Sequence, residues 1–438
     1  MLALLISEHC AALKAPSAVT GWSRTPSFAR SPHETSSGRP SRICGPGRPQ
    51  RSRAAMPIEA QSPPLLRDSS ALDEALMARF ASAGFLRLDP PILQPADAFL
   101  DLSGETIRRS MFLTSGEDGQ ELCLRPDLTI PVAREVQRLH LPMPAAVSYL
   151  GPVFRSHSGG AGEFRQAGVE SFGRADTAAA DADILALGLE TCAIYGVPDP
   201  EILIGDVGLF SAVLEALPLA PAWRRRLMKD FGQGRLDEDI ANLSESEAKG
   251  TAAVHAGVLS ALAGSDPDAA RALITDLLSI AGITTVGGRT VSEIAARFLE
   301  QAALEGNGLS AETAAILSRY LAITGAPGPA LEQVRALANE ARIDISGALA
   351  AFEERASHLA AHGVNLSEVE FSAAFGRPLD YYSGMVFELS DPEGRVAAPL
   401  VAGGRYDRLM SRLGAETVVP AVGFAAWVER LALLESQS

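Results

Sequence analysis

The sequence has few of the features that define several protein classes. It holds four cysteines in 438 residues, none in a Cys-x-x-Cys pair, and no His/Cys cluster has the spacing of a zinc site. These cysteines are therefore expected to be free thiols in a reducing cytosol. No apolar run approaches the roughly 20 residues that cross a bilayer. The composition predicts a cytoplasmic protein without a membrane segment, a bound metal or a cofactor.

Basic residues are also in the minority, and they are unevenly placed. The net charge is −15, yet residues 1–55 carry Lys14 and seven arginines against Glu8 and Glu34, a net charge of +6, so the remainder carries about −21. Because Lys and Arg drive binding to phosphate backbones, the acidic body argues mildly against a large nucleic-acid surface. A local basic patch is compatible with this average.

Residues 1–55 differ from the rest of the chain in composition. They are rich in Ser, Pro, Gly and Arg and show little periodicity. A start codon placed too far upstream, with Met56 as the true start, is the favoured interpretation; a disordered tail and an organellar transit peptide are the alternatives. This segment is excluded from the fold prediction.

The remaining sequence predicts an α+β fold with a mostly antiparallel sheet. Helical spacing and a C-terminal glycine predict helices from Asp68–Ser70 to Gly84 and over 181–195, and a last helix over 425–434. Short alternating runs around the glycine-rich segment 158–162 predict a long hairpin of 145–155 and 163–173. Further strands are predicted over 85–93, where Pro90 and Pro91 favour an edge position, and over 201–204, 385–389, 397–401 and 418–424.

Three segments follow from this distribution. Residues 216–365 are dominated by Ala, Leu, Glu and Arg and are predicted to form a helical insertion. Residues 56–215 and 366–438 contain the predicted strands. They are expected to form the first and second parts of one α+β domain that is interrupted by the insertion.

Four short polar motifs are candidates for a binding site. Asp127 and Thr129 lie in Arg125-Pro126-Asp127-Leu128-Thr129 and, taken alone, favour a helix N-cap. Arg155 ends the first hairpin strand, where an arginine either binds a carboxylate or phosphate or forms a surface ion pair. On the return strand, period two puts Gln166 and Glu170 on one face with Gly168, which leaves a floor for a small polar ligand or a solvated face.

The last motif is Arg377-Pro378-Leu379-Asp380-Tyr381-Tyr382. Two phenols on stiff rings can orient a ring nitrogen, and Arg377 supplies a second cation. An isolated Tyr-Tyr pair is more often a pair of core or edge aromatics. Near the C-terminus, Glu429-Arg430 on a helix is expected to be a structural ion pair, with an anion site as the alternative.

The order and spacing of these motifs resemble the class II aminoacyl-tRNA synthetase catalytic fold of the histidyl type. Gly84-Phe85 to Pro91 resembles motif 1, Phe154-Arg155 with Gln166-x-x-x-Glu170 resembles motif 2, and the segment from Gly423 to Leu431 resembles motif 3. Arg377-x-Leu-Asp-Tyr-Tyr resembles the histidine-specific motif. The resemblance implies that a small set of side chains binds histidine: Asp127, Thr129, Arg155, Gln166, Glu170, Arg377, Tyr381 and Tyr382.

Three departures from the synthetase pattern argue against catalysis. The chain ends eight residues after Arg430, where the synthetases continue with an anticodon-binding domain of about 100 residues. His157 stands where motif 2 has a glutamate that helps to seat ATP. Trp427 stands two residues before Glu429, where motif 3 has a small glycine, and should crowd the adenosine.

A retained histidine site, a damaged ATP site and no tRNA-binding domain resemble the family of ATP phosphoribosyltransferase regulatory subunits. That resemblance implies a homodimer within a hetero-oligomer with a short catalytic subunit, at the first step of histidine biosynthesis. It implies histidine feedback on that enzyme and no catalytic residue, no cofactor and no tRNA partner. The alternatives are a truncated enzyme that still forms histidyl-adenylate, which Arg377 keeps open, and a histidine-binding module with another partner.

Overall fold

The computed structural model describes residues 69–232 and 309–435, apart from gaps at 101, 103–104, 157–161, 378 and 380, and a few isolated residues between 236 and 290. The N-terminal extension and His157 lie outside the described residues. The helices are α1 (Ser69–Ser82), α2 (Asp97–Leu100), α3 (Glu105–Ser110), α4 (Thr129–Arg138), α5 (Thr177–Ile194), α6 (Val207–Ala216), α7 (Pro221–Gly232), α12 (Ala311–Leu321), α13 (Pro327–Ala341), α14 (Ser346–Ala361), α15 (Leu409–Arg412) and α16 (Val428–Glu435).

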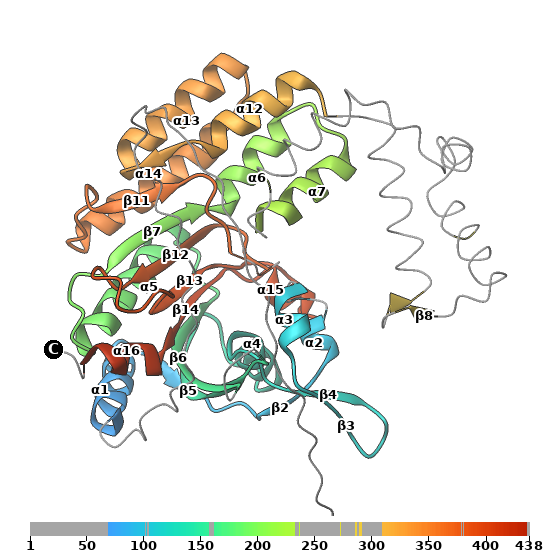
Figure 1. Ribbon diagram of the computed structural model, residues 1–438, viewed down its shortest axis with the longest axis vertical. Coiled ribbons are helices and arrows are strands. Elements are labelled where there is room, and N and C mark those ends of the chain that lie inside the picture. The colour runs from blue at the N-terminus through green and yellow to red at the C-terminus, as the bar shows by residue number, and fades with distance from the viewer. Residues whose placement is uncertain are drawn as a thin grey trace, which may run out of the picture. The chain divides into compact units, whose positions relative to one another are not determined.

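A large, mostly antiparallel sheet forms the centre of the fold (Figure 1). Only the pairs β1–β5 and β11–β7 are parallel in it. Its order is β1 (Leu86–Arg87), β5 (Ala145–Phe154), β6 (Glu163–Phe172), β14 (Ala421–Trp427), β13 (Val401–Arg405), β12 (Met385–Ser390), β7 (Glu201–Asp206), β11 (Val369–Ser372) and β10 (Thr324–Gly325). A small sheet has the order β2 (Leu93–Pro95), β4 (Glu121–Leu124), β3 (Leu113–Ser115), and β8 (Thr285–Val286) pairs with β9 (Arg289–Thr290).

Two hydrophobic clusters cover the two faces of the sheet, one on each face. Period two along β6 puts Ala167 and Val169 in the larger cluster, together with α1, α5 and the helices α12–α14. Phe172 belongs to the smaller cluster, which contains α4 and α15. The residues between Ala167 and Phe172 that point to the second face are Gly168 and Glu170. Glu170, and by the same period Gln166, therefore face the side where α4 lies.

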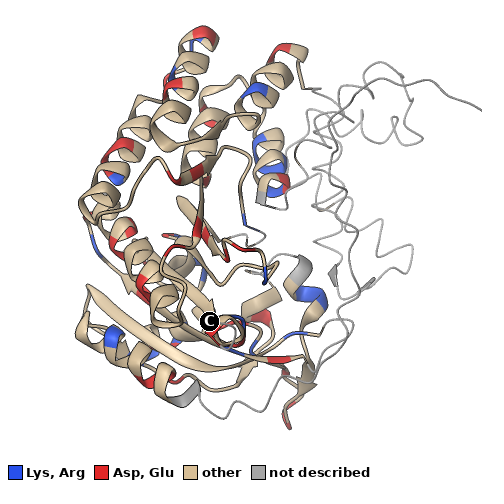
Figure 2. Ribbon diagram, turned by 60° about the vertical axis from the view of Figure 1, so that its left-hand side comes forward, with Lys and Arg blue, Asp and Glu red and all other residues tan. Residues whose placement is uncertain are grey.

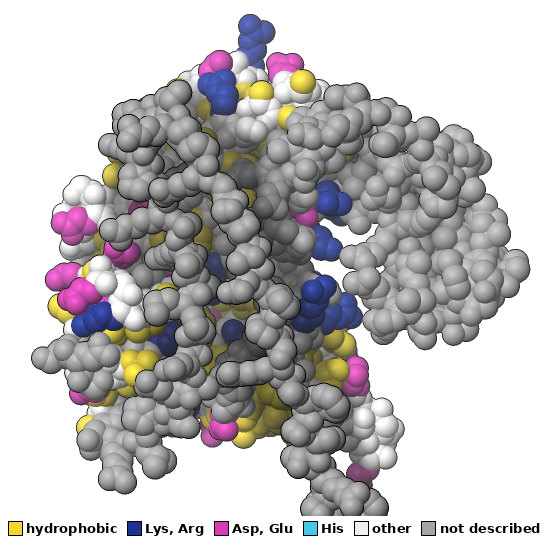
Figure 3. Space-filling view, viewed as in Figure 1, with side chains coloured by type: hydrophobic (Ala, Val, Ile, Leu, Met, Phe, Trp, Pro, Cys, Tyr) yellow, Lys and Arg dark blue, Asp and Glu magenta, His cyan; other side chains and the backbone are white. Residues whose placement is uncertain are grey.

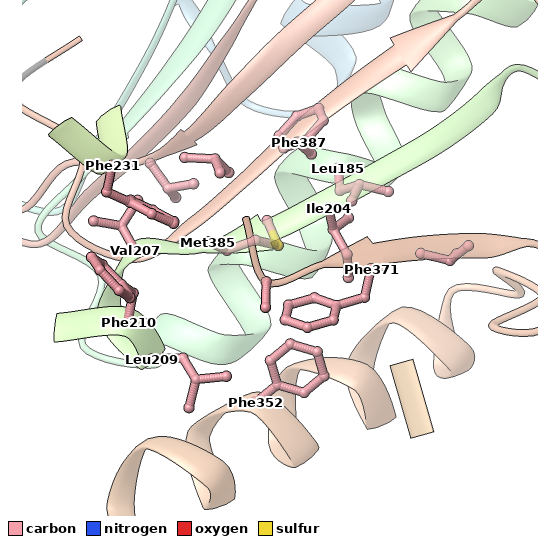
Figure 4. Packing of buried hydrophobic residues seen from close by; sticks show 14 of the residues in the cluster. Leu185, Ile204, Val207, Leu209, Phe210, Phe231, Phe352, Phe371, Met385 and Phe387 are labelled. Atoms are coloured by element: carbon pink, nitrogen blue, oxygen red, sulfur yellow. The ribbon is translucent and has the colours of Figure 1, made fainter. Parts of the chain in front are cut away.

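The helices α12–α14 pack on the end of the sheet where β7 and β11 lie (Figure 1). Figure 4 shows Phe352 of α14 against Phe371 of β11, with ring centroids 5.2 Å apart in an edge arrangement. Phe210 of α6 stacks on Phe231 of α7 with centroids 4.2 Å apart. Each such aromatic pair contributes about 0.5–1.5 kcal/mol beyond burial. The limits of the predicted helical insertion, 216 and 365, stay a prediction, but α12–α14 share the core of the sheet.

Buried ion pairs tie these helices to the sheet. Arg355 of α14 donates from Nε to Asp181 Oδ2 of α5 at 2.8 Å and from Nη1 to Asp206 Oδ2 of β7 at 2.6 Å. Arg405 of β13 donates from Nε to the other oxygen of Asp181 at 2.8 Å. All four side chains are buried. Burial alone lowers the pKa of Arg355, but Asp206 and Asp181 raise it well above its usual value.

The predicted α+β class is confirmed, and so is the hairpin, which runs as β5 and β6. The helix predicted over 181–195 begins earlier, at Thr177. The strand predicted over 397–401 is wrong, because β13 begins at Val401 and includes Gly403. Glycine is required there, since a Cβ on Gly403 would lie 2.2 Å from the carbonyl oxygen of Gly423. The last strand is also displaced, to Ala421–Trp427.

Charges of both signs are spread along the helices (Figure 2). Within the described part of the chain, no helix is long and apolar enough to cross a membrane. The same residues contain no group of three or more His, Cys, Asp or Glu side chains arranged to hold a metal ion.

Candidate functional site

A cavity of about 130 Å³ lies on the face of β6 that carries its polar residues. We call it the polar cavity. The register of β6 with β14 aligns Glu170 with Gly423 and Gln166 with Trp427. Glycine is needed at 423, because a Cβ there would lie 1.7 Å from Glu170 Oε2. All eight residues predicted from the sequence line this cavity: Asp127, Thr129, Arg155, Gln166, Glu170, Arg377, Tyr381 and Tyr382.

Asp127 serves both the local structure and the cavity. Its Oδ1 accepts a hydrogen bond of 3.2 Å from the backbone N–H of Ile130, in the first turn of α4. The N-cap position itself is held by Leu128, whose side chain makes no capping bond, so the N-cap predicted at Asp127 or Thr129 is displaced. Its other oxygen, Oδ2, is buried without a hydrogen-bond partner among the described residues. Burial raises the pKa of Asp127, while the Arg155 guanidinium opposes this shift.

Glu170 is the most enclosed carboxyl group of the cavity, with 1% of its surface exposed. Tyr149 donates a hydrogen bond of 3.1 Å to its Oε1, and Tyr406 donates a second to its Oε2. Burial raises the pKa of Glu170 to about 8, although hydrogen bonds from Tyr406, Thr129 and Tyr149 favour the ionised form. The protonated form of Glu170 is therefore favoured at neutral pH.

Three tyrosine rings form one wall. The centroid of Tyr381 lies 5.0 Å from that of Tyr382 and 5.7 Å from that of Tyr406. Burial raises the pKa of Tyr382 to about 12, and those of Tyr381 and Tyr406 lie well above their usual value. The three phenols stay neutral and offer hydrogen bonds from fixed positions.

Two arginines face these carboxyl groups. Arg155 follows β5, donates from Nε to the carbonyl oxygen of Pro126 at 2.7 Å, and lies 5.4 Å from the ring centroid of Phe164. Arg377 forms an ion pair with Glu388 of β12 through Nη1. Its Nε is buried without a hydrogen-bond partner among the described residues. Both cations are thus fixed by the protein, and Arg377 keeps an unused donor.

Trp427 also lines the cavity and is 8% exposed. The guanidinium carbon of Arg430 lies 4.5 Å from its ring centroid, and Arg430 Nη1 donates to the carbonyl oxygen of Pro399 at 2.5 Å. Burial lowers the pKa of Arg430 to about 10. The expected Glu429–Arg430 ion pair is wrong: Glu429 accepts instead from the backbone N–H of Arg165, with Oε2 at 2.9 Å.

Buried groups without partners are rare in folded proteins, so several around one cavity indicate that a ligand completes them. Besides Asp127 Oδ2 and Arg377 Nε, the Oε1 atom of Gln166 is buried and has no partner among the described residues. These two acceptors and this guanidinium donor belong to residues that line a cavity smaller than the ~300 Å³ of common drug-sized pockets. This arrangement fits a small ligand that carries both ammonium and carboxylate groups.

Sequence reasoning missed two tyrosines that matter for the site. Tyr149 and Tyr406 hold both oxygens of Glu170, but neither was selected as a site residue. Tyr149 lies directly opposite Gly168 across the β5–β6 ladder. A large aromatic facing a glycine was the one available signal, and it depends on the register of the hairpin.

The chain is similar to known proteins in both sequence and fold. The model of the histidyl-tRNA synthetase family matches residues 58–287 and 288–431. The ATP phosphoribosyltransferase regulatory subunit of Brucella canis is 41% identical over 350 residues, which cover 79% of this chain and 92% of that protein.

Solved structures share the fold. A protein of Bacillus halodurans described as an ATP phosphoribosyltransferase regulatory subunit/histidyl-tRNA synthetase superposes with a TM-score of 0.59 at 21% identity, covering 87% of this chain and 83% of the other. A histidine–tRNA ligase subunit of Alicyclobacillus acidocaldarius gives a TM-score of 0.52 at 25% identity, covering 88% and 99%. The chain thus has the histidyl-tRNA synthetase fold, and it belongs to the family of ATP phosphoribosyltransferase regulatory subunits.

Proposed function

We propose that the polar cavity binds L-histidine and that its occupancy regulates a short catalytic subunit of ATP phosphoribosyltransferase, at the first step of histidine biosynthesis. The observation that supports this proposal is the set of unpartnered buried atoms on residues that line one small cavity: Asp127 Oδ2, Gln166 Oε1 and Arg377 Nε. A zwitterionic amino acid has an ammonium group for the two acceptors and a carboxylate for the donor.

The polar groups suggest an orientation for the ligand. Asp127 and Thr129 suit the ammonium group, with Gln166 as a further acceptor. Arg377 or Arg155 suits the carboxylate, because a guanidinium binds carboxylates in a planar, bidentate geometry. Glu170 and the phenol of Tyr382 would then each engage one imidazole nitrogen, which fixes the tautomer. A ligand without these nitrogens would leave buried groups unpaired, and this would make the cavity selective.

The pKa of Glu170 suits an imidazole partner. At pH 7 the carboxyl group of the empty cavity carries a proton, whereas free histidine has a mostly neutral ring, since its ordinary pKa is about 6.5. Glu170 and the bound imidazole then share one proton. Between about pH 6.5 and pH 8, histidine therefore binds without net uptake or release of a proton. Below about pH 6.5 the ligand brings a second proton that must be released, and affinity should fall.

Reconstitution with the short catalytic subunit tests the regulatory role. We expect the catalytic subunit to be active with this chain and L-histidine to inhibit the complex. Histidine that binds tightly but leaves the activity of the complex unchanged would reject the regulatory part of the proposal. By linkage, the catalytic substrates and histidine must change each other's affinity by the same factor. Histidine affinity measured with and without those substrates checks this reciprocity.

We expect no ATP–pyrophosphate exchange in the presence of L-histidine. Trp427 lies opposite Gln166 and is held by Arg430 at 4.5 Å, where an adenosine ring would need open space. The assay follows labelled pyrophosphate entering ATP. Robust exchange would instead support the alternative function, a truncated enzyme that forms histidyl-adenylate.

We also propose that the chain forms a homodimer within the complex. Four large apolar side chains are exposed on or beside three edge strands, β1, β2 and β3: Leu86 (56%), Ile92 (42%), Leu93 (51%) and Leu113 (52%). Exposed edges and apolar side chains of this kind favour association. The substitution Leu93→Glu is therefore expected to yield monomers in sedimentation velocity, whereas the wild type sediments as a dimer. As a control, Val418→Glu changes a side chain exposed to 62% outside these strands and should leave the dimer intact.

A monomeric wild type would contradict the dimer, and so would a Leu93→Glu variant that sediments like the wild type.

The proposal places the complex in the cytoplasm, without tRNA as a partner. The described cysteines fit a reducing compartment, because Cys123 and Cys192 are buried free thiols. Burial raises the pKa of each to about 12.

A further inference from the structure

A second, larger cavity of about 700 Å³ adjoins the polar cavity. We call it the basic cavity. It lies between the helices α6 and α7 and the segment 377–383, and its only described acidic lining residue is Glu215. Figure 3 shows dark-blue side chains on the side of the molecule where α7 and α3 lie in Figure 1. Its basic lining residues are Arg224, Arg225, Lys229, Arg377, Arg408 and Arg412.

Two of these guanidinium groups have donors that the protein does not use. The Nε atoms of Arg224 and Arg377 are buried and have no hydrogen-bond partner among the described residues. A buried donor that stays unpaired is unfavourable, so such a donor points to a partner. Glu215 does not compensate them, since its Oε1 accepts from Ser211 Oγ at 3.3 Å. Two unused donors beside an excess of positive charge indicate an anionic ligand.

From these observations we infer that the basic cavity binds a small organic phosphate with at least two phosphate charges. Guanidinium groups match phosphate oxygens in a planar, bidentate geometry. The volume is within the range of about 300–1,000 Å³ of small-molecule sites. Arg377 is paired with Glu388, and Arg225 and Arg412 have partners of their own, but Arg224, Lys229 and Arg408 still outnumber the one acidic lining residue, Glu215. A cavity of this size in a chain with a net charge of −15 does not fit a nucleic-acid duplex.

The two cavities share a wall, which consists of Arg377, Leu379, Tyr381 and Tyr382. If histidine occupies the polar cavity as proposed, its carboxylate and the phosphate compete for the unused donor of Arg377. Their negative charges also repel. Histidine should therefore weaken phosphate binding, and the phosphate should weaken histidine binding by the same factor. This coupling rests on the proposed function, whereas the phosphate site itself does not.

The test uses the full chain and inorganic pyrophosphate in isothermal titration calorimetry, first without histidine. We expect one pyrophosphate per chain, at least tenfold weaker binding for Arg224→Gln, and weaker binding for Lys229→Gln. Lys229 is exposed on α7 and should tolerate the change. Arg335→Gln is the matched control, because Arg335 pairs with Glu353 on a different surface. Parallel titrations with ribose 5-phosphate and ADP separate a sugar phosphate from a nucleotide as the natural ligand.

Three outcomes would overturn the site. They are no pyrophosphate binding at millimolar concentration, equal losses in Arg224→Gln and Arg335→Gln, or an Arg224→Gln variant that binds pyrophosphate normally but fails to assemble with the catalytic subunit. The last would make the cavity a protein contact. A final titration in saturating histidine should show at least threefold weaker pyrophosphate binding. If histidine itself does not bind, the proposed function fails while the pyrophosphate titration stands on its own.

Discussion

Replacing Glu170 by Gln is expected to weaken L-histidine binding by roughly 10- to 150-fold. A hydrogen bond to a charged group contributes about 1.5–3 kcal/mol, and each 1.4 kcal/mol is a factor of ten. The amide retains the size of the side chain. Its oxygen can accept from Tyr406, while its NH2 group can donate to the hydroxyl oxygen of Tyr149, whose own O–H donates to the carbonyl oxygen of Phe424 at 3.2 Å, so the cavity should keep its shape. Calorimetric titration of both proteins with histidine measures the loss. Glu163→Gln, an exposed position at the start of the same strand, is the control and should bind normally.

The same substitution should stabilise the empty protein at neutral pH. The pKa of Glu170 is raised from 4.5 to about 8 by burial, so between these values the folded state binds more protons than the unfolded state. Stability then falls as pH rises, by up to about 1.4 kcal/mol per pH unit. Gln cannot titrate, so its advantage over Glu should grow by about 2–3 kcal/mol from pH 5 to pH 7.

Urea unfolding at several pH values checks this linkage. Because Asp127 is present in both proteins, the difference between them isolates Glu170. A Glu170→Gln variant that is less stable than the wild type at pH 7 would contradict a protonated acid in the cavity.

Tyr382→Phe should also weaken histidine inhibition of the complex, while basal activity remains. Unchanged inhibition in both variants would reject the assignment of the imidazole partners.

Replacing Arg355 by Ala is expected to destabilise the fold by about 3–5 kcal/mol, since it leaves buried carboxylates without their cation. Arg355 bridges Asp181 and Asp206 at 2.8 and 2.6 Å. Arg405 continues to neutralise Asp181, so Asp206 should lose the most. The unfolding midpoint in urea measures the effect.

Arg319→Ala is the matched control. Arg319 also pairs with a carboxylate, Glu340 at 2.5 Å, but both side chains are more than half exposed. Water screens this pair, so its loss should leave the midpoint nearly unchanged. Equal effects of the two substitutions would show that burial does not determine the importance of Arg355. The α14 helix would then be held by its apolar contacts alone, such as Phe352 against Phe371.

Local patterns predicted the parts of the fold that depend on neighbouring residues. The β5–β6 hairpin follows from alternation around a glycine-rich turn, and the α1 helix follows from its apolar spacing and Gly84. Strand β13 could not be placed, because its glycines satisfy a contact with β14 rather than a local rule. The bridge from Arg355 to Asp181 joins residues 174 positions apart, which no local pattern shows.

The candidate site shows the same division. The eight predicted residues came from the order of motifs and their resemblance to a family, and the structure brings them to one cavity. Tyr149 and Tyr406 were not predicted as site residues, because their contacts with Glu170 depend on how β6 is aligned with its neighbouring strands. Trp427 was predicted from its position alone to obstruct adenosine; it lines the cavity, and the obstruction itself stays a prediction.

The most direct test of the central claim is a calorimetric titration of the full chain with L-histidine near pH 7, repeated in two buffers of different ionisation enthalpy. We predict one histidine per chain and nearly equal heats in the two buffers, because Glu170 already holds the proton that the pair shares. Histidinol, which lacks the carboxylate, should bind more weakly. The absence of any heat of binding, or equal affinity for wild type and Glu170→Gln, would contradict the account.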